Sequence, residues 1–164
     1  MKLNEVIAKY GNQEVDESKI KEVLGVKESK VWKPKGDERF YVVAGYGRIL
    51  SGTSNSMEFW EDYFDVGNCY KTLEEVEFAR DKQIFLTKFE RYLRENEDEP
   101  VNWKNESQAK YSVEFNFRIN SKICIAVNNY YMKQGTIYTT NFEALNSYVK
   151  DNESDIKKYM FGVE

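Results

Sequence analysis

The segments GNCYKTLEEVE (residues 67–77) and QGTIYTTNFEA (residues 134–144) share the spacing Gly-x-x-Tyr-x-Thr-x-x-Glu. The glycine suits a turn, and the Tyr-containing stretch after it is typical of a short strand. A Thr followed three residues later by a Glu, directly before an apolar helical stripe, is the pattern of a capping box. The repeat therefore predicts the same structural step twice: a turn, a short strand and a helix capped by Thr72 or Thr140.

Each repeat follows a stretch that predicts a β-hairpin. In residues 39–50, apolar side chains fill both faces of a strand, and Gly45 and Gly47 suit the turn before a return strand. In residues 111–127, alternation places Val113, Phe115, Phe117 and Ile119 on one buried face. A tight turn at residues 120–121 then leads into the return strand. We expect an α+β fold of two β-β-β-α units, about residues 37–100 and 108–164, with helices packed on one face of an antiparallel sheet.

The remaining helices are predicted from apolar spacing and from their stop signals. Residues 1–30 show two short amphipathic patterns, each ended by a glycine, and are expected to form an N-terminal helical arm. Residues 31–164 then form the α+β domain. The first capped helix is expected to run to about Asn96, and a last short helix is expected to end at Gly162.

Composition argues against several classes of function. The 164-residue chain has no His, which removes the commonest general base and metal ligand. Its net charge is −4, with the acidic excess in the middle of the chain, so a phosphate backbone is a poor ligand. Cys69 and Cys124 are too few for a disulfide framework or a zinc site. We expect no catalytic residues, no metal, no cofactor and no direct nucleic-acid ligand.

The sequence shows neither a transmembrane stretch nor a secretory signal pattern. We therefore expect no membrane association and a cytoplasmic location.

An aromatic and acidic loop, residues 52–66, is present in the first unit and lacks a counterpart in the second. Its clustered carboxylates could suggest a magnesium site, but no accompanying ligand motif supports one. Aromatic anchors with a charged rim are typical of a protein–protein hot spot. The predicted protein-binding residues are Phe59, Trp60, Glu61, Asp62, Tyr63 and Asp65.

A second hypothesis is a small-ligand site. A signalling nucleotide would need aromatic walls and a few cationic groups, and Arg39, Arg48 and Lys71 are available near the first predicted sheet. The Tyr and Phe residues of the second unit could also stack bases. The alternation of the strands and the acidic balance favour a role in the core instead.

The lead-in strands, both repeated segments, the opening LNEVIAKYG, the linker KVWKPKGDE and the ending IKKYMFGVE resemble small accessory proteins encoded by phages and prophages of Gram-positive bacteria. The resemblance extends over nearly the whole chain and rests on structural motifs, so it brings with it no established activity and no assigned site residues. It implies an accessory protein in the host bacterial cytoplasm. Such proteins often disable a host defence by binding a protein or a signalling nucleotide.

From these observations we expect a non-catalytic protein that binds a host macromolecule, most concretely an inhibitor of a CRISPR effector nuclease that acts by surface occlusion. A signalling-nucleotide binder or sponge is the alternative. The sequence leaves the oligomeric state open, including a homodimer.

Overall fold

The computed structural model describes residues 31–118 and 121–163. The predicted N-terminal arm lies outside these residues, as do Ile119 and Asn120. The described part has helices and two small antiparallel sheets, which is an α+β architecture.

The first sheet is a hairpin of β1 (Arg39–Val43) and β2 (Ile49–Thr53). The strands pair antiparallel, with Val43 opposite Ile49 and Arg39 opposite Thr53. Phe40 and Val42 are fully buried, whereas Tyr41 and Val43 on the other face are half-buried. The short 3₁₀ turn η1 (Gly45–Gly47) joins the strands, which confirms the predicted turn.

Two helices follow the first hairpin. The short helix α3 (Trp60–Asp65) lies within the aromatic and acidic loop. The long helix α4 (Leu73–Glu95) begins after Thr72, whose side chain accepts from the backbone N–H of Glu75 at 3.2 Å. The Glu75 carboxylate in turn accepts from the backbone N–H of Thr72 at 3.0 Å. The predicted capping box and the predicted extent of this helix are confirmed.

The second sheet is a hairpin of β3 (Tyr111–Asn116) and β4 (Lys122–Val127), with Tyr111 opposite Val127. β3 ends before Phe117, so the predicted burial of Phe117 is wrong, and this side chain is 71% exposed. Phe115 is half-buried and packs against Phe161, with ring centroids 5.4 Å apart.

Three helical segments complete the chain: α5 (Phe142–Asp151), α6 (Glu153–Ile156) and the π-helical turn η2 (Lys157–Phe161). Gly162, with φ of 65°, ends the last segment as predicted.

The second repeat does not form the predicted capping box. Asn141 is the N-cap of α5, and its side-chain oxygen accepts from the backbone N–H of Ala144 at 2.9 Å. The Thr140 hydroxyl instead donates to the backbone carbonyl of Glu99 at 2.7 Å. The helix therefore begins one residue later than predicted, because Thr140 is used to hold the loop that follows α4.

The third strand expected in each unit is reduced to a single bridge. Tyr70 forms an antiparallel bridge with Tyr41 of β1, and Thr139 forms one with Tyr111 of β3. Each hairpin is thus followed by a one-residue pairing and then a helix. The glycines that precede these bridges, Gly67 and Gly135, have φ of 74° and 75°, so both turns use the glycine conformation that the repeat predicts.

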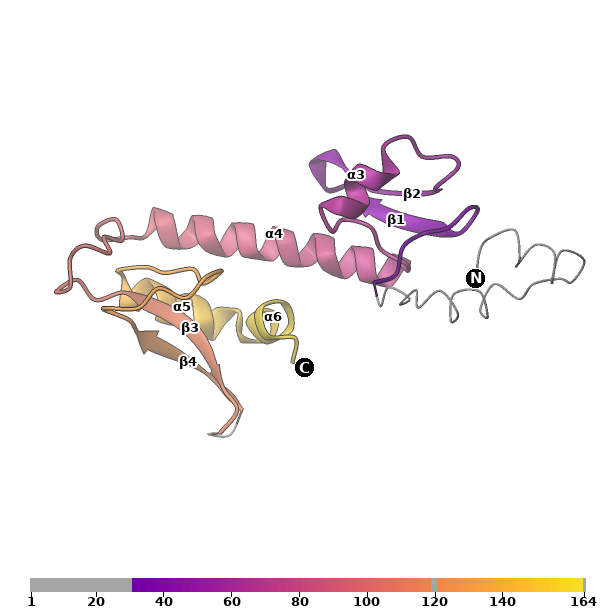
Figure 1. Ribbon diagram of the computed structural model, residues 1–164. Coiled ribbons are helices and arrows are strands. Elements are labelled where there is room, and N and C mark those ends of the chain that lie inside the picture. Colours follow the sequence, from indigo (N-terminus) through magenta and orange to yellow (C-terminus); the bar gives the residue numbers. More distant parts are fainter. Residues whose placement is uncertain (1–30, 119–120, 164) are drawn as a thin grey trace, which may run out of the picture.

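Both halves of the described structure lie along helix α4. Figure 1 shows the first hairpin and α3 at one end of α4, with the second hairpin, α5 and α6 towards the other. α4 contacts both β1 and η2. The main core cluster joins the second half of α4 to β3, α5 and α6, and consists of Phe85, Phe89, Leu93, Val113, Leu145 and Ile156.

Candidate functional site

Helix α3 is pinned to the first hairpin by its aromatic residues. Trp60 lies 6.3 Å from Phe40, measured between ring centroids. The Lys33 ammonium lies 5.1 Å from the Trp60 ring centroid and 5.2 Å from that of Phe64, within cation–π range. These contacts hold a six-residue helix that would not be stable by itself.

Phe59 precedes α3 and points into solvent. Its φ of 60° places it in the left-handed region, and its side chain is 65% exposed. At the other end of α3, Val66 is 76% exposed. Four carboxylates in the same stretch of chain are exposed as well: Glu58, Glu61, Asp62 and Asp65. We call Phe59, Val66 and these four carboxylates the α3 surface.

The structure divides the predicted protein-binding residues into two groups. Phe59, Glu61, Asp62 and Asp65 are exposed, whereas Trp60 and Tyr63 are half-buried. Glu61 lies 3.8 Å from the Lys33 ammonium, a long contact between two exposed groups that contributes little. The most exposed aromatic side chain of this segment is therefore Phe59, whereas Trp60 packs against Phe40.

Arg39, Arg48 and Lys71, the cations suggested for a small ligand, do not converge. Arg39 lies at the open end of the first hairpin, opposite Thr53, and Arg48 lies at its turn. Lys71 follows the bridge residue Tyr70. None of the three lines any of the cavities described below.

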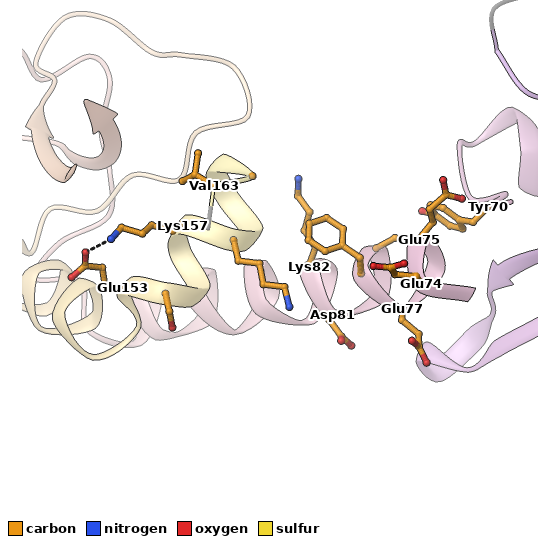
Figure 2. Close-up of a pocket in the computed structure, with 14 residues that line it drawn as sticks. Tyr70, Glu74, Glu75, Glu77, Asp81, Lys82, Glu153, Lys157 and Val163 are labelled. Carbon is orange, nitrogen blue, oxygen red and sulfur yellow. Dashed lines mark ion pairs between the residues drawn. The ribbon is translucent and has the colours of Figure 1, made fainter. Parts of the chain in front are cut away.

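One cavity lies between the first half of α4 and the C-terminal segment. Its volume is about 1440 Å³, and Figure 2 shows its labelled side chains coming from these two parts of the chain and from Tyr70, just before α4. Glu75 is engaged in the capping box, and Glu153 pairs with Lys157 at 2.6 Å. This hydrogen bond and the Lys157 charge lower the pKa of Glu153. Two of the acidic groups in this cavity thus have structural partners.

A second cavity of about 760 Å³ lies between the η1 turn, the segment around Gly67 and α4. The charged residues that line it are all basic: Arg80, Lys88 and Arg91. Sequence analysis missed this groove, although Arg80, Ile84, Lys88 and Arg91 have the spacing of one helix face.

Exposed apolar side chains lie at the end of β4 and in the loop after it. Val127, Tyr130, Tyr131 and Met132 are 61–78% exposed. Tyr130 and Tyr131 therefore lie in the loop between β4 and α5. Met132 also lines a third cavity of about 530 Å³, together with Trp103 and Tyr138, whose rings meet edge-on at 4.9 Å.

Metal binding and thiol chemistry depend on the surroundings of the residues in the described ranges. No three of their His, Cys, Asp or Glu side chains are grouped so as to hold a metal ion. Burial raises the pKa of the Cys69 thiol. The pKa of Tyr70 is raised too, mainly by burial and to a smaller extent by the nearby Cys69. Raised pKa values leave both groups protonated at neutral pH, which disfavours them as nucleophiles. Within the same ranges, no helix is both long and apolar enough to span a bilayer.

Comparison with known protein families, curated proteins and solved structures finds no match to this chain.

Proposed function

We propose that this chain is a non-catalytic accessory protein that binds another protein through the α3 surface. The observation that carries the proposal is Phe59, an aromatic residue with φ of 60° and a side chain that is 65% exposed.

The conformation of Phe59 is costly and gives the fold little in return. A non-glycine residue in the left-handed region costs on the order of 1–3 kcal/mol, and such strain clusters at functional sites. Glycine or asparagine would adopt this conformation more easily. Retention of an exposed ring here is explained if the ring fills a pocket on a partner, because aromatic anchors dominate the binding energy of interfaces.

The charges around Phe59 indicate what kind of partner fits. Glu58, Asp62 and Asp65 are exposed and have no ion pair within the described part of the chain. An apolar centre with a carboxylate rim complements a basic surface that has an apolar pocket. The nucleic-acid channel of an RNA-guided nuclease is such a basic surface. The resemblance to phage accessory proteins supplies a bacterial cytoplasm as the place where the two would meet.

The mechanism we propose is occlusion. The α3 surface covers part of the basic channel of a CRISPR effector nuclease and so competes with the phosphate backbone for it. No bond is made or broken, which agrees with a chain that has no His and whose Cys69 thiol has a raised pKa.

The experiment is a DNA-cleavage assay with purified RNA-guided effector nucleases from Gram-positive bacteria. Wild-type protein is expected to inhibit at near-stoichiometric amounts. Phe59→Asn is expected to weaken inhibition about tenfold or more, since interface anchors are worth about 2 kcal/mol or more. Asparagine tolerates the left-handed conformation, so this variant should fold.

A matched control changes an exposed ring elsewhere. Phe117→Asn removes a side chain that is 71% exposed at the end of the second hairpin, and should leave inhibition unchanged. Equal loss with both variants, or no loss with Phe59→Asn, would contradict the assignment of the α3 surface. Absence of inhibition with every nuclease tested would contradict the nuclease as partner.

A further inference from the structure

The basic groove beside α4 is a second candidate binding site, which adjoins the α3 surface at Val66. Its walls are the η1 turn, residues 66–68 and one face of α4 from Ala79 to Arg91. Its volume of about 760 Å³ lies within the range of roughly 300–1,000 Å³ that is typical of small-ligand sites.

The charge of the groove is unusual for this chain. The net charge of the protein is −4, yet the lining contains Arg80, Lys88 and Arg91 and no Asp or Glu. Arg80 pairs with Asp81 at 2.8 Å. Lys88 and Arg91 are exposed and make no ion pair with any residue in the described ranges. Two cations are thus available for an anionic ligand, and a third lies beside them.

The cations form a row along one side of α4. Arg80 and Lys88 are eight residues apart, with Arg91 almost one turn further on, so their Cα atoms extend over about 16 Å of helix. Ile84 and Thr87 lie between them on the same wall. The core face of α4, which carries Phe85 and Phe89, is used for packing. The basic row is therefore free to face a ligand.

Tyr46, in the η1 turn, is one of the residues that line the groove. Its side chain is fully exposed, and its φ of 61° places it in the left-handed region. The next residue, Gly47, lies against α4, because a Cβ at this position would be 4.0 Å from Cγ of Arg80. The turn thus holds an uncovered phenol ring at the same groove as the arginine, in a conformation that contributes strain and not packing.

We propose that this groove binds a nucleotide-type ligand, with its phosphates on Lys88, Arg91 and Arg80 and its base stacked on Tyr46. Arg and Lys are the side chains that bind phosphate groups, and an exposed tyrosine ring stacks bases without regard to sequence. A longer nucleic acid fits less well, because Val66 joins the groove to the carboxylates of the α3 surface, which repel a continuing phosphate chain. This proposal does not depend on the partner of the α3 surface.

The test is isothermal titration calorimetry with three probes: adenosine triphosphate, inorganic tripolyphosphate and adenosine. Wild type should bind adenosine triphosphate more tightly than either of the other two. The double variant Lys88→Gln with Arg91→Gln should weaken the binding of adenosine triphosphate and of tripolyphosphate at least tenfold each. Tyr46→Asn should weaken the binding of adenosine triphosphate about five- to tenfold, since stacking on one ring is worth about 1–3 kcal/mol. The affinity for tripolyphosphate should not change.

Controls separate this site from general surface charge. Arg39→Gln with Lys71→Gln removes two exposed cations outside the groove and should not change any of the three affinities. A thermal melt of each variant shows that it is folded. The proposal is overturned if wild type does not bind adenosine triphosphate, or if the control pair weakens it as much as the groove pair. Tighter binding of a 20-nucleotide single strand or of polyglutamate than of adenosine triphosphate would also overturn it, in favour of a polymeric partner.

Discussion

At the scale of single residues, Tyr46 and Phe59 share two properties that natural sequences seldom combine. Both are aromatic residues with positive φ, and both have side chains that are mostly or fully exposed. Tyr46 and Gly47 are the two residues of a turn in which φ is positive at both positions, a geometry that favours Asn-Gly. Each ring therefore occupies a position where folding alone would favour a different residue.

This strain predicts that removal of either ring stabilises the fold. Tyr46→Asn and Phe59→Asn should each raise the free energy of unfolding by about 1 kcal/mol, because asparagine reaches the left-handed region at lower cost. Urea unfolding measures the change. Tyr131→Asn is the control, since Tyr131 is 78% exposed but does not have a positive φ. A loss of stability in both strained variants, with no such loss in the control, would show that the rings support the fold.

The two cysteines should differ in reactivity. Cys69 is half-buried and its pKa is raised by burial, whereas Cys124 is exposed. A raised pKa lowers the thiolate fraction at any given pH, so iodoacetamide at pH 8 should modify Cys124 first. In Cys124→Ser, modification of Cys69 should still accelerate with pH above about 8.5, the ordinary value. Peptide mass spectrometry measures both rates, and earlier modification of Cys69 would contradict its burial.

Residue types alone could predict the turns better than the site. Gly67 and Gly135 were predictable because few other residues accept a φ near 75°. The sequence could not predict that Phe59 is exposed and Trp60 is half-buried, because both are aromatic residues next to each other in one loop. Only the position of Phe40 and Lys33 decides which ring is covered.

At the scale of elements, the two copies of the repeated spacing differ in how they begin their helices. Thr72 and Glu75 cap α4 reciprocally, whereas Asn141 caps α5 and Thr140 bonds to Glu99. Sequence spacing could predict the presence and the extent of α4. It could not predict the shift at α5, because Asn141 is an equally good N-cap and the competing bond comes from a loop 41 residues away.

This difference predicts unequal effects for matched substitutions. Glu75→Ala removes the carboxylate that accepts from the Lys71 and Thr72 backbone N–H groups, at 2.9 and 3.0 Å. Glu143 holds the same position in the repeat and is exposed in the first turn of α5. In thermal unfolding, Glu75→Ala should lower the free energy of unfolding by about 1 kcal/mol more than Glu143→Ala does. Equal costs would mean that the capping box of α4 contributes no more than the helix dipole does.

At the scale of the whole molecule, α4 joins what would otherwise be two small units. Its first turns lie by β1, and its second half is the centre of the core cluster. Neither two-stranded hairpin has enough partners to be stable by itself. The sequence could predict both hairpins and the helix, but not that one helix supports both, because that depends on contacts between distant segments.

A shared helix predicts cooperative unfolding. Phe89 is fully buried and packs against Tyr148 at 4.8 Å, so Phe89→Ala should cost about 3–5 kcal/mol. Hydrogen exchange should then show loss of protection in α5 and also in β1, on the other side of α4. Unchanged protection of β1 would show that the two halves unfold independently.

The central claim is that the chain acts by binding a partner protein through the α3 surface. The most direct measurement compares proteins captured from a Gram-positive bacterial lysate, by quantitative mass spectrometry, on three baits. The first bait is wild type. The second, the α3 variant, combines Phe59→Asn, Asp62→Asn and Asp65→Asn. The third, the control, combines Tyr131→Asn, Glu99→Gln and Glu106→Gln, whose side chains are also exposed. The account predicts a protein that is enriched by wild type and by the control and is lost with the α3 variant. Equal capture by all three baits, or no protein enriched by wild type, would contradict it.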